Sequence, residues 1–278
     1  MRHTKTILFA LICLLLTSPA EAGLSVAVSI KPVHSLVAAV MDGVGEPSLI
    51  VKGSRSPHSY SLKPSDARAL SRADVVIWMG PDMELFLQKP IGALSSRSKV
   101  ITLIEVKSGD PHLWLSPKLA ISMVSKIALA LIKTDPANTD SYKSNANALT
   151  DRLRALQAYG MGKLSAIAKE PFLVFHDAWS HFARSFGLSI AGAVALSPER
   201  PAGAKQVSTI RRLIGESGAR CLFREPQFKS PLLSSILEDH KKMRVFELDP
   251  LGAAYKPGPT LYFKMMETNI DAVASCLQ

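Results

Sequence analysis

The chain has 278 residues, of which 47% are hydrophobic and 20% are charged. This composition is that of an ordinary globular protein and excludes a disordered, collagen-like or polytopic membrane chain. Lys and Arg number 33 against 23 Asp and Glu, which gives a net charge of +10. Because the basic residues are scattered, without basic runs or interleaved aromatic residues, we expect a solvated basic surface and no nucleic-acid partner. Three cysteines are too few for a disulfide-dense scaffold or a zinc site made of cysteine alone.

The first 22 residues have the pattern of a secretory signal peptide. A short basic start with Arg2 and Lys5 precedes the apolar run from Ile7 to Leu16, and Ala20-Glu21-Ala22 fits the small-x-small cleavage pattern. A membrane anchor is the alternative, but about ten apolar residues fall short of the roughly 20 that a spanning helix needs. We therefore expect residues 1–22 to be removed on export, which lowers the net charge to +9.

Short β-branched runs alternate with helical patterns along the rest of the chain. Parallel strands covered by helices on both faces are typical of this alternation, which predicts an α/β fold. The runs are Val26–Ile30, Ser48–Val51, Val75–Trp78, Val100–Leu103, Phe172–Phe175, Leu188–Val194, Cys221–Phe223 and Val245–Leu248. They fall into two sets separated by a long helical stretch, so we expect two sheets, each with roughly four parallel strands.

The helical stretch between the two sets has clear boundaries. Ser116-Pro117 is an N-cap and first-turn pair that opens a helix to about Lys133, and Asp135-Pro136 repeats this signal. The second helix carries one apolar stripe, which continues through Leu164 and Ile167 although Gly160 and Gly162 weaken its last turns. The stripe begins with Tyr142, Ala146, Leu149, Leu153 and Leu156.

The length of this second helix predicts how the chain is divided. A helix of about 30 residues is roughly 45 Å long, which is more than one compact lobe needs. We therefore expect an N-terminal lobe over residues 23–134 and a C-terminal lobe over residues 170–278. A rigid linking helix over residues 135–169 would join them.

Export also decides how the cysteines are interpreted. Cys13 leaves with the signal peptide, and Cys221 and Cys276 remain. In an oxidising compartment these two residues have only one intramolecular arrangement, which predicts a Cys221–Cys276 disulfide. The alternative is a pair of unpaired buried thiols.

Three histidines and one aspartate directly follow predicted strands. His58 and His112 follow the second and fourth runs, His176 ends the fifth, and Asp249 closes the eighth. Ligands of open α/β sheets bind outside the carboxyl ends of the strands, so these residues can converge in a cleft between the lobes. Three imidazoles and one oxygen suit zinc, whereas calcium and magnesium prefer oxygen ligands. The alternative is that each residue has an unrelated loop or core role.

Motifs spread over essentially the whole chain after residue 22 are specific enough to indicate a family. They are Ser29-Ile-Lys-Pro-Val-His-Ser-Leu36, Ser56-Pro-His-Ser-Tyr-Ser-Leu-Lys-Pro-Ser-Asp66, Ala73-Asp-Val-Val-Ile-Trp-Met-Gly-Pro81, Asp110-Pro-His-Leu-Trp-Leu-Ser-Pro117, Phe175-His-Asp-Ala-Trp179, Cys221-Leu-Phe-Arg-Glu-Pro-Gln-Phe228 and Leu248-Asp-Pro-Leu-Gly252. In this order they closely resemble the periplasmic zinc-binding proteins of bacterial ABC importers, in cluster A-I of the solute-binding proteins.

The resemblance implies both a fold and a set of ligands. The family's fold is two α/β lobes joined by a rigid helix, and its metal ligands match His58, His112 and His176. A carboxylate matching Asp249, or a water molecule, would take the fourth position. Manganese-binding relatives have a glutamate in place of the third histidine, so His176 favours zinc. Zinc-binding members often carry a disulfide matching Cys221 and Cys276.

The chain departs from the family pattern at two places. Many zinc-binding relatives insert a loop rich in His, Asp and Glu before the second ligand motif, whereas Glu105-Val-Lys-Ser-Gly-Asp110 leads directly to His112. This is the short variant, for which no zinc-gathering or sensing role of such a loop is expected. Pro57 stands where some relatives have an acidic residue before the first histidine, so that position offers no carboxylate.

Other polar residues near the motifs have less specific roles. We expect Asp177 or Glu225 to orient a ligand imidazole through its second nitrogen, with a capping or solvated role as the alternative. His34 is expected in the first turn of a helix, His181 on a helix face, and His240 in a basic surface run.

The leading hypothesis for function is a non-catalytic periplasmic solute-binding protein. It would capture Zn²⁺ as its transported ligand and, as a monomer, deliver it to an ABC permease in the inner membrane, with a periplasmic zinc metallochaperone as a further partner. Manganese or iron transport is the alternative within this class. A three-histidine zinc hydrolase is the alternative from another class. It would need a positioned general base, as in H-E-x-x-H, and this motif does not occur in the sequence.

Overall fold

The computed structural model describes residues 23–94, 96, 98–104, 109–195, 204–228 and 240–278. The predicted signal peptide over residues 1–22 lies outside the described residues. The same holds for residues 105–108 of the short connection that leads to His112.

The first lobe contains a parallel four-stranded sheet in the order β2-β1-β3-β4. Its strands are β1 (Val26–Val28), β2 (Ser48–Leu49), β3 (Val75–Trp78) and β4 (Lys99–Thr102). Helices α1 (Lys31–Val40), α2 (Pro64–Arg72) and α3 (Leu85–Gly92) connect them, with a single 3₁₀ turn, η1 (Pro57–Ser59), after β2. Strand β1 lies in the middle and pairs with both β2 and β3. The carboxyl ends of the strands therefore open on one edge of the sheet.

The second lobe repeats this order with β6-β5-β7-β8, again all parallel. Its strands are β5 (Pro171–His176), β6 (Ser189–Ala195), β7 (Cys221–Arg224) and β8 (Arg244–Glu247), and its helices are α6 (Ser180–Phe186), α7 (Ala204–Ser217) and α9 (Leu261–Leu277). All eight strands predicted from the sequence are present, each within two residues of its expected bounds. The two-lobed α/β architecture is confirmed.

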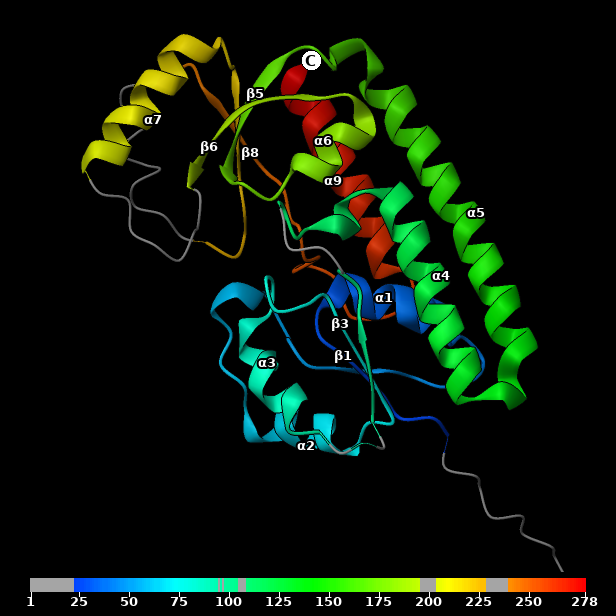
Figure 1. Ribbon diagram of the computed structural model, residues 1–278. Coiled ribbons are helices and arrows are strands. Elements are labelled where there is room, and N and C mark those ends of the chain that lie inside the picture. Colours follow the sequence, from blue (N-terminus) through cyan, green and yellow to red (C-terminus); the bar gives the residue numbers. More distant parts are fainter. Residues whose placement is uncertain (1–22, 95, 97, 105–108, 196–203, 229–239) are drawn as a thin grey trace, which may run out of the picture.

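Helices α4 (Pro117–Thr134) and α5 (Thr139–Leu164) connect the lobes, with short 3₁₀ turns η2 (Leu113–Leu115), η3 (Pro136–Asn138) and η4 (Ser165–Ile167) at their ends. The start of α4 has the predicted cap, because Ser116 Oγ accepts a hydrogen bond from the Leu119 amide and Pro117 follows it. Figure 1 shows α5 running along one side of both lobes. It packs on α1 of the first lobe, on α6 and α9 of the second, and on α4.

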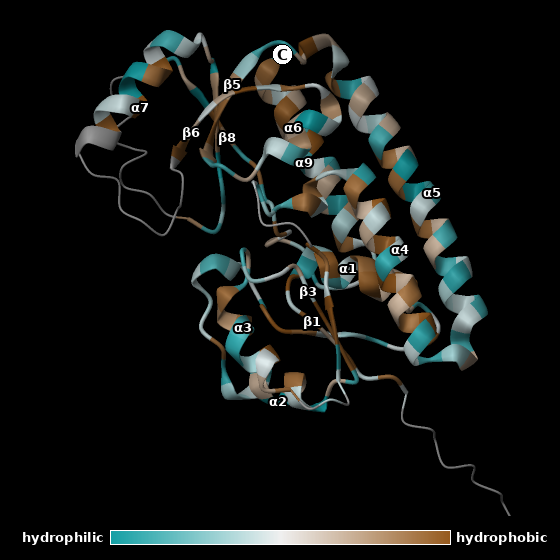
Figure 2. Ribbon diagram, in the orientation of Figure 1, coloured by the Kyte–Doolittle hydropathy of each residue, from teal (hydrophilic) through white to brown (hydrophobic). Residues whose placement is uncertain are grey.

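One hydrophobic core runs through both lobes and the helices between them. It includes Val28 of β1, Leu153 of α5 and Phe172 of β5, together with the fully buried Trp114 and Tyr262. Smaller clusters cover the opposite faces of the two sheets. Figure 2 shows β1 and β3, the two inner strands of the first sheet, as mainly hydrophobic, as parallel strands buried on both faces should be. Because the core is continuous, a large hinge movement between the lobes would require buried side chains to separate.

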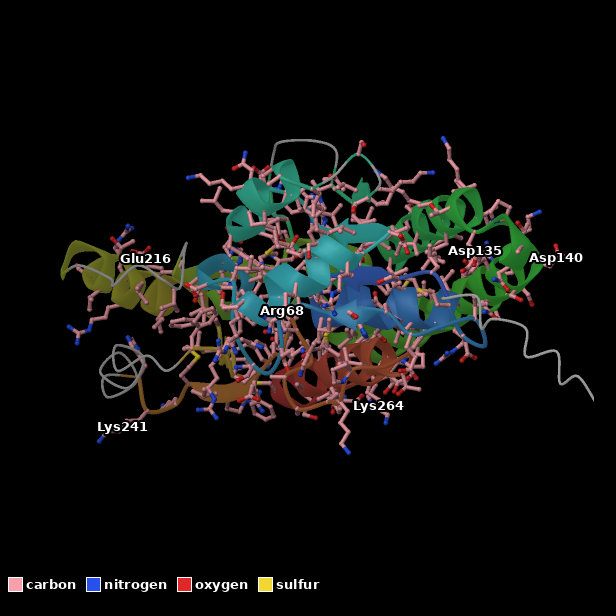
Figure 3. All side chains as sticks on the ribbon, turned by 90° about the horizontal axis from the view of Figure 1, so that it is seen from below. Arg68, Asp135, Asp140, Glu216, Lys241 and Lys264 are labelled. Carbon is pink, nitrogen blue, oxygen red and sulfur yellow. A yellow bond between two sulfur atoms is a disulfide. The ribbon has the colours of Figure 1, made fainter. Side chains whose placement is uncertain are left out.

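Most charged residues lie on the outside of this core, and the described exceptions are the buried Lys31, Asp66, Glu84 and Glu225. In Figure 3, labelled residues of both signs point outward at opposite ends of the molecule, from Glu216 and Lys241 at one end to Asp140 at the other. This agrees with the expected solvated surface. None of the described helices is both long and apolar enough to cross a membrane.

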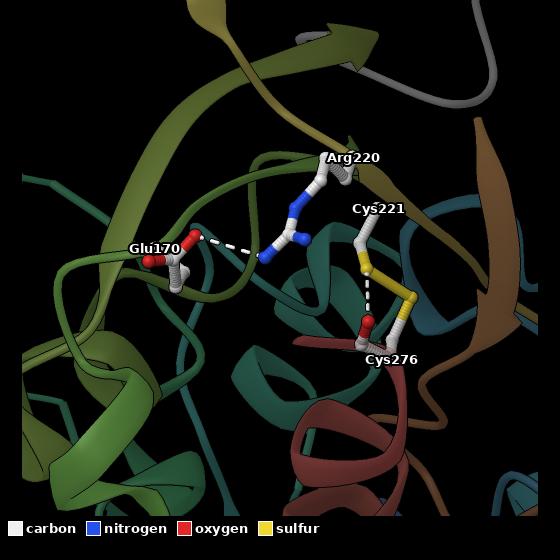
Figure 4. Close-up of a disulfide and its surroundings, with 4 residues drawn as sticks. All are labelled: Glu170, Arg220, Cys221 and Cys276. Atoms are coloured by element: carbon white, nitrogen blue, oxygen red, sulfur yellow. Dashed lines mark hydrogen bonds and ion pairs between the residues drawn. A yellow bond between two sulfur atoms is a disulfide. The ribbon is translucent and has the colours of Figure 1, made fainter. Parts of the chain in front are cut away.

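The predicted disulfide is present in the second lobe. It joins Cys221 in β7 to Cys276 near the end of α9, with 6.1 Å between the two Cα atoms (Figure 4). Both residues are completely buried. The C-terminal helix is therefore attached covalently to an inner strand of the second sheet.

Candidate metal centre

His58 comes from the segment that follows β2. It lies in the 3₁₀ turn η1, where Ser56 is the N-cap and Pro57 the first residue, and its amide donates a hydrogen bond to Ser56 Oγ over 3.3 Å. Proline and a serine cap favour this turn, because proline fixes φ and the hydroxyl accepts from the amide two residues later. His58 is partly exposed, so it is the most accessible of the three histidines that follow strands.

His112 precedes η2, after β4, and only 3% of it is exposed. Asp110 Oδ1 accepts a hydrogen bond from the His112 amide over 2.9 Å and also lies 2.6 Å from His112 Nδ1. An ionised carboxylate only accepts, so Nδ1 carries the proton and Nε2 keeps its lone pair for a metal. Burial alone would raise the pKa of Asp110, but its contacts with His112 outweigh that effect and lower the pKa to about 2. Burial lowers the pKa of His112, more than Asp110 raises it, and this favours the neutral imidazole.

His176 is the last residue of β5 and is 5% exposed. Its Nδ1 lies 3.4 Å from the carboxylate of Glu225, the residue after β7, which pairs with β5 in the sheet. Glu225 is also buried and accepts a hydrogen bond from Trp179 Nε1 over 3.1 Å. The neighbouring strand thus supplies a carboxylate that directs the second imidazole, in the manner usual for metal-ligating histidines.

The structure brings these three histidines together between the lobes. One ring nitrogen from each lies within 4.8 Å of the other two, and His58 Nε2 is 3.4 Å from His112 Nε2. Two nitrogens bound to one tetrahedral zinc would be roughly 3.3 Å apart, given Zn–N distances near 2.05 Å. The histidines line a cavity of about 10 Å³, and the other residues around it are Ser56, Pro57, Glu225, Gln227, Phe228, Pro250 and Leu251. This space fits one ion or water molecule and nothing larger.

Asp249 is not one of the residues that the structure brings together at this point. Its carboxylate accepts hydrogen bonds from Gln227 Nε2 over 2.8 Å, from the Leu251 amide over 3.0 Å, and from the Ala253 amide. The residue does not line the cavity, although Pro250 and Leu251 of the same loop do. As described, the carboxylate stabilises the turn after β8.

Asp177 and Glu225 were the two carboxylates expected from the sequence to orient an imidazole, and in the structure Glu225 is the one beside His176. Asp177 is exposed. Sequence reasoning missed Asp110, which is in closer contact with its histidine than Glu225 is. The signal was available, because an Asp two residues before another residue often accepts that residue's amide proton in an Asx turn. The short Asp-Pro-His spacing brings the same carboxylate to the imidazole.

The other described histidines have structural roles. In α1, His34 Nε2 lies 2.9 Å from the Pro47 carbonyl oxygen, while His181 Nε2 of α6 lies 2.8 Å from the Asp110 carbonyl oxygen. His181 therefore supports the segment that orients His112. His240 is partly buried beside the exposed Lys241 and Lys242.

Comparison with known proteins agrees with this geometry. Residues 26–276 match the family model described as zinc-uptake complex component A, periplasmic (ZnuA). The chain belongs to this family. It is 37% identical to the high-affinity zinc uptake system protein ZnuA of Brucella abortus (strain 2308), and the matched region covers 91% of each chain.

Solved structures of the family agree in fold. The crystal structure of ZnuA superposes with a TM-score of 0.80 at 25% identity and covers 92% of this chain and 100% of the other. A zinc-bound ZnuA deletion mutant superposes equally well, with a TM-score of 0.80 at 25% identity and coverage of 92% and 98%. The family consists of solute-binding transport proteins of the periplasm that work with an ABC transporter permease, and its members are not classed as enzymes.

Proposed function

We propose that this protein captures Zn²⁺ with His58, His112 and His176 and delivers it to an ABC permease in the inner membrane. Residues 1–22 would direct its export and then be removed, and the mature protein would act as a monomer in the periplasm. A zinc metallochaperone that loads the protein is a further partner in this proposal.

The convergence of three imidazole nitrogens within 4.8 Å carries the proposal. Three histidines that packed together only as core residues would not need two separate buried carboxylates to orient them. Asp110 and Glu225 each direct one imidazole, so that its other nitrogen is available as a ligand. Neutral imidazole suits zinc, whereas manganese, magnesium and calcium are better served by oxygen ligands. Of the two candidates for the fourth position, we infer a water molecule over Asp249, because the Asp249 carboxylate accepts hydrogen bonds within its own turn.

Isothermal titration calorimetry of the purified, metal-stripped protein tests the proposal. We expect tight binding of one Zn²⁺ per chain and loss of this binding in a variant that carries His58→Ala, His112→Ala and His176→Ala. His240→Ala is the matched control, because it also removes an imidazole but lies in the surface run and should bind zinc as the parent does. Binding that survives the triple substitution would contradict the proposal, as would a parent protein that binds no zinc.

The pH dependence of capture provides a second test. Zinc must displace protons from any charged ligand imidazole, so the apparent affinity should fall as the pH drops through the histidine range near 6.5. Because burial lowers the pKa of His112, this residue should stay available at a lower pH than a solvated histidine. Competition between zinc and manganese in the same assay would show which metal the site prefers.

A further inference from the structure

Lys31 is buried where the two lobes meet, and the proposed zinc site gives it no role. It is the first residue of α1 and only 5% exposed, whereas lysine is almost never buried unless its charge is paired. Its ammonium group donates hydrogen bonds of 3.1 Å each to the carbonyl oxygens of Gly252, Ala253 and Tyr255. All three of its protons are therefore used on one loop.

That loop belongs to the second lobe and forms one wall of the metal cavity. It follows β8, and its residues Pro250 and Leu251 line the cavity with the three histidines. The first lobe holds it at a second point, because Trp114 Nε1 donates a hydrogen bond of 2.7 Å to the Pro250 carbonyl oxygen. Lys31 thus attaches a wall of the site, 221 residues away in the sequence, to the first lobe.

The same loop contains Asp249, whose carboxylate is directed to atoms of its own turn. It accepts from the amides of Leu251 and Ala253 and from the side chain of Gln227. The Asp249 charge favours the charged form of Lys31, although burial of the lysine has the larger and opposite effect on its pKa. Lys31 and Asp249 therefore stabilise one conformation of the loop from its two sides.

We propose that Lys31 is a positioning residue that determines metal specificity, because it holds residues 249–255 in the conformation that keeps the Asp249 carboxylate out of the coordination sphere. This inference rests on the proposed zinc-binding function. For Asp249 to reach a metal bound by the histidines, its carboxylate would have to leave the loop amides and the loop would have to shift. The three hydrogen bonds from Lys31 oppose any such shift.

The consequence concerns which metal is bound. A site of three imidazoles and a water molecule suits zinc. An added carboxylate supplies an oxygen ligand of the kind that manganese prefers, so it makes the site more favourable for manganese. Lys31 would therefore lower the affinity for manganese relative to that for zinc without contacting either metal. A merely structural lysine would change the stability of the fold but would leave the ratio of zinc to manganese affinity unchanged.

The test measures the dissociation constants of Zn²⁺ and Mn²⁺ for the full chain and for Lys31→Met, Lys31→Arg and Asp249→Asn. Lys31→Met keeps the length of the side chain but removes the three donors, and we expect the preference for zinc to fall by at least roughly tenfold, the scale for groups that act on a metal through its ligands. Lys31→Arg keeps charge and donors and should retain the parental ratio. Adding Asp249→Asn to Lys31→Met should restore the preference, since the carboxylate that binds manganese is gone.

Asp249→Asn alone makes the test independent of whether the lysine variants fold. It should leave the ratio of the two affinities unchanged, because the parental carboxylate does not bind the metal. A tenfold change in this single variant, or a parental ratio in Lys31→Met, would overturn the inference while the zinc-binding function stood. A crystal structure of the zinc complex with Asp249 as a ligand would do the same. A parent that bound no zinc would instead contradict the proposed function.

Discussion

His112 in the first lobe is supported by a carboxylate two residues away, whereas His176 in the second lobe is supported by one that is 49 residues away. The first contact, at 2.6 Å, is made within one turn, and it needs only that this turn forms. The second, at 3.4 Å, needs β5 and β7 to be neighbours in the sheet. The two halves of the site thus differ in how far they depend on the fold around them.

A second difference is that the described part of the first lobe has no disulfide, while the second has Cys221–Cys276. Cys221 opens β7, the strand that leads directly to Glu225. The covalent link from α9 therefore fixes the strand that carries the distant carboxylate. The lobe whose histidine depends on long-range pairing is also the lobe in which a strand is cross-linked to a helix.

Removal of this disulfide should have the largest effect. With about 55 residues in the closed loop, the double variant Cys221→Ala, Cys276→Ala should lose roughly 4 kcal/mol of unfolding free energy, because its unfolded chain is less restricted. Urea denaturation in the presence of a chelator measures this. Arg220→Ala is the control, since it removes the exposed ion pair with Glu170 next to Cys221 (Figure 4) and should cost less than about 1 kcal/mol. Equal losses in the two variants would contradict this account of the second lobe.

In each sheet, the third strand in the spatial order is followed by a buried glutamate. Glu84 follows β3 in the first sheet, and Glu225 follows β7 in the second. Glu225 faces a histidine, but Glu84 accepts hydrogen bonds from the amides of Met79 and Gly80, over 2.7 and 3.4 Å. Burial raises the pKa of Glu84 to about 7, more than these hydrogen bonds lower it. Glu84 therefore stabilises a backbone turn in the first lobe, whereas Glu225 directs a histidine of the proposed zinc site in the second.

Substitution of Glu84 should have the next largest effect, and it should depend on pH. Since the pKa is raised from 4.5 to about 7 in the folded state, the folded protein binds more protons than the unfolded chain between these values. The stabilisation is complete below pH 4.5 and is lost as the pH rises through 7, on the order of 3 kcal/mol in all. Glu84→Gln removes this titration, so its unfolding free energy relative to the parent should rise from pH 5 to pH 8 in urea denaturation. A constant difference would show that the carboxyl does not titrate in this range.

The difference between local and distant contacts also explains what the sequence could predict. The eight strands and the apolar stripe of α5 follow from local patterns and are present. The three histidines were recognisable because each follows a strand, and parallel sheets bring such positions to one edge. The contact between Glu225 and His176 needed the strand order, and the three carbonyl oxygens bound by Lys31 needed the position of one lobe relative to the other. Neither can be obtained from the spacing of residues.

Asp110 and Asp249 mark the limits of this reasoning from opposite sides. The role of Asp110 was not predicted although its contact with His112 is local, because an Asp before Pro is also common in turns that orient no imidazole. Asp249 was expected at the metal because it closes a strand, yet its carboxylate faces the amides of the following turn. A position at a strand end predicts that a residue is near the site. The direction of its side chain depends on the loop.

Substitution of the two carboxylates that direct histidines, Asp110 and Glu225, tests this difference between the lobes. Loss of a carboxylate that directs a metal-binding histidine typically costs 10–100-fold in metal affinity. We expect Asp110→Asn to approach the upper end and Glu225→Gln the lower end, because the Asp110 contact is 0.8 Å shorter than the Glu225 contact, 2.6 against 3.4 Å. Zinc titration by calorimetry measures both. Asp177→Asn, an exposed carboxylate beside His176, is the matched control and should bind zinc as the parent does; the reverse order of the first two variants would refute the comparison.

The linking helix α5 contacts the two lobes in different ways. Near its start, the Asn145 amide group donates hydrogen bonds of 3.0 and 2.9 Å to the carbonyl oxygens of Val40 and Asp42 in the first lobe. Near its end, Gly160 is so close to Phe186 of the second lobe that an added Cβ would lie 2.8 Å from the ring atom Cζ. Gly162, two residues later, has open space around it. The two glycines in the last turns of α5 therefore differ: close packing excludes a side chain at Gly160, whereas Gly162 has room for one.

Alanine at these two positions should have opposite effects, the smallest of this series. In Gly162→Ala the gain in helix propensity should stabilise the protein by about 0.5–1 kcal/mol. In Gly160→Ala the same gain is opposed by overpacking against Phe186, which typically costs 1–3 kcal/mol, so we expect a net loss of about 1 kcal/mol. Thermal and urea denaturation measure both variants. Stabilisation by both would mean that α6 can move away from α5, and the contact with the second lobe would then be as adaptable as the polar one with the first.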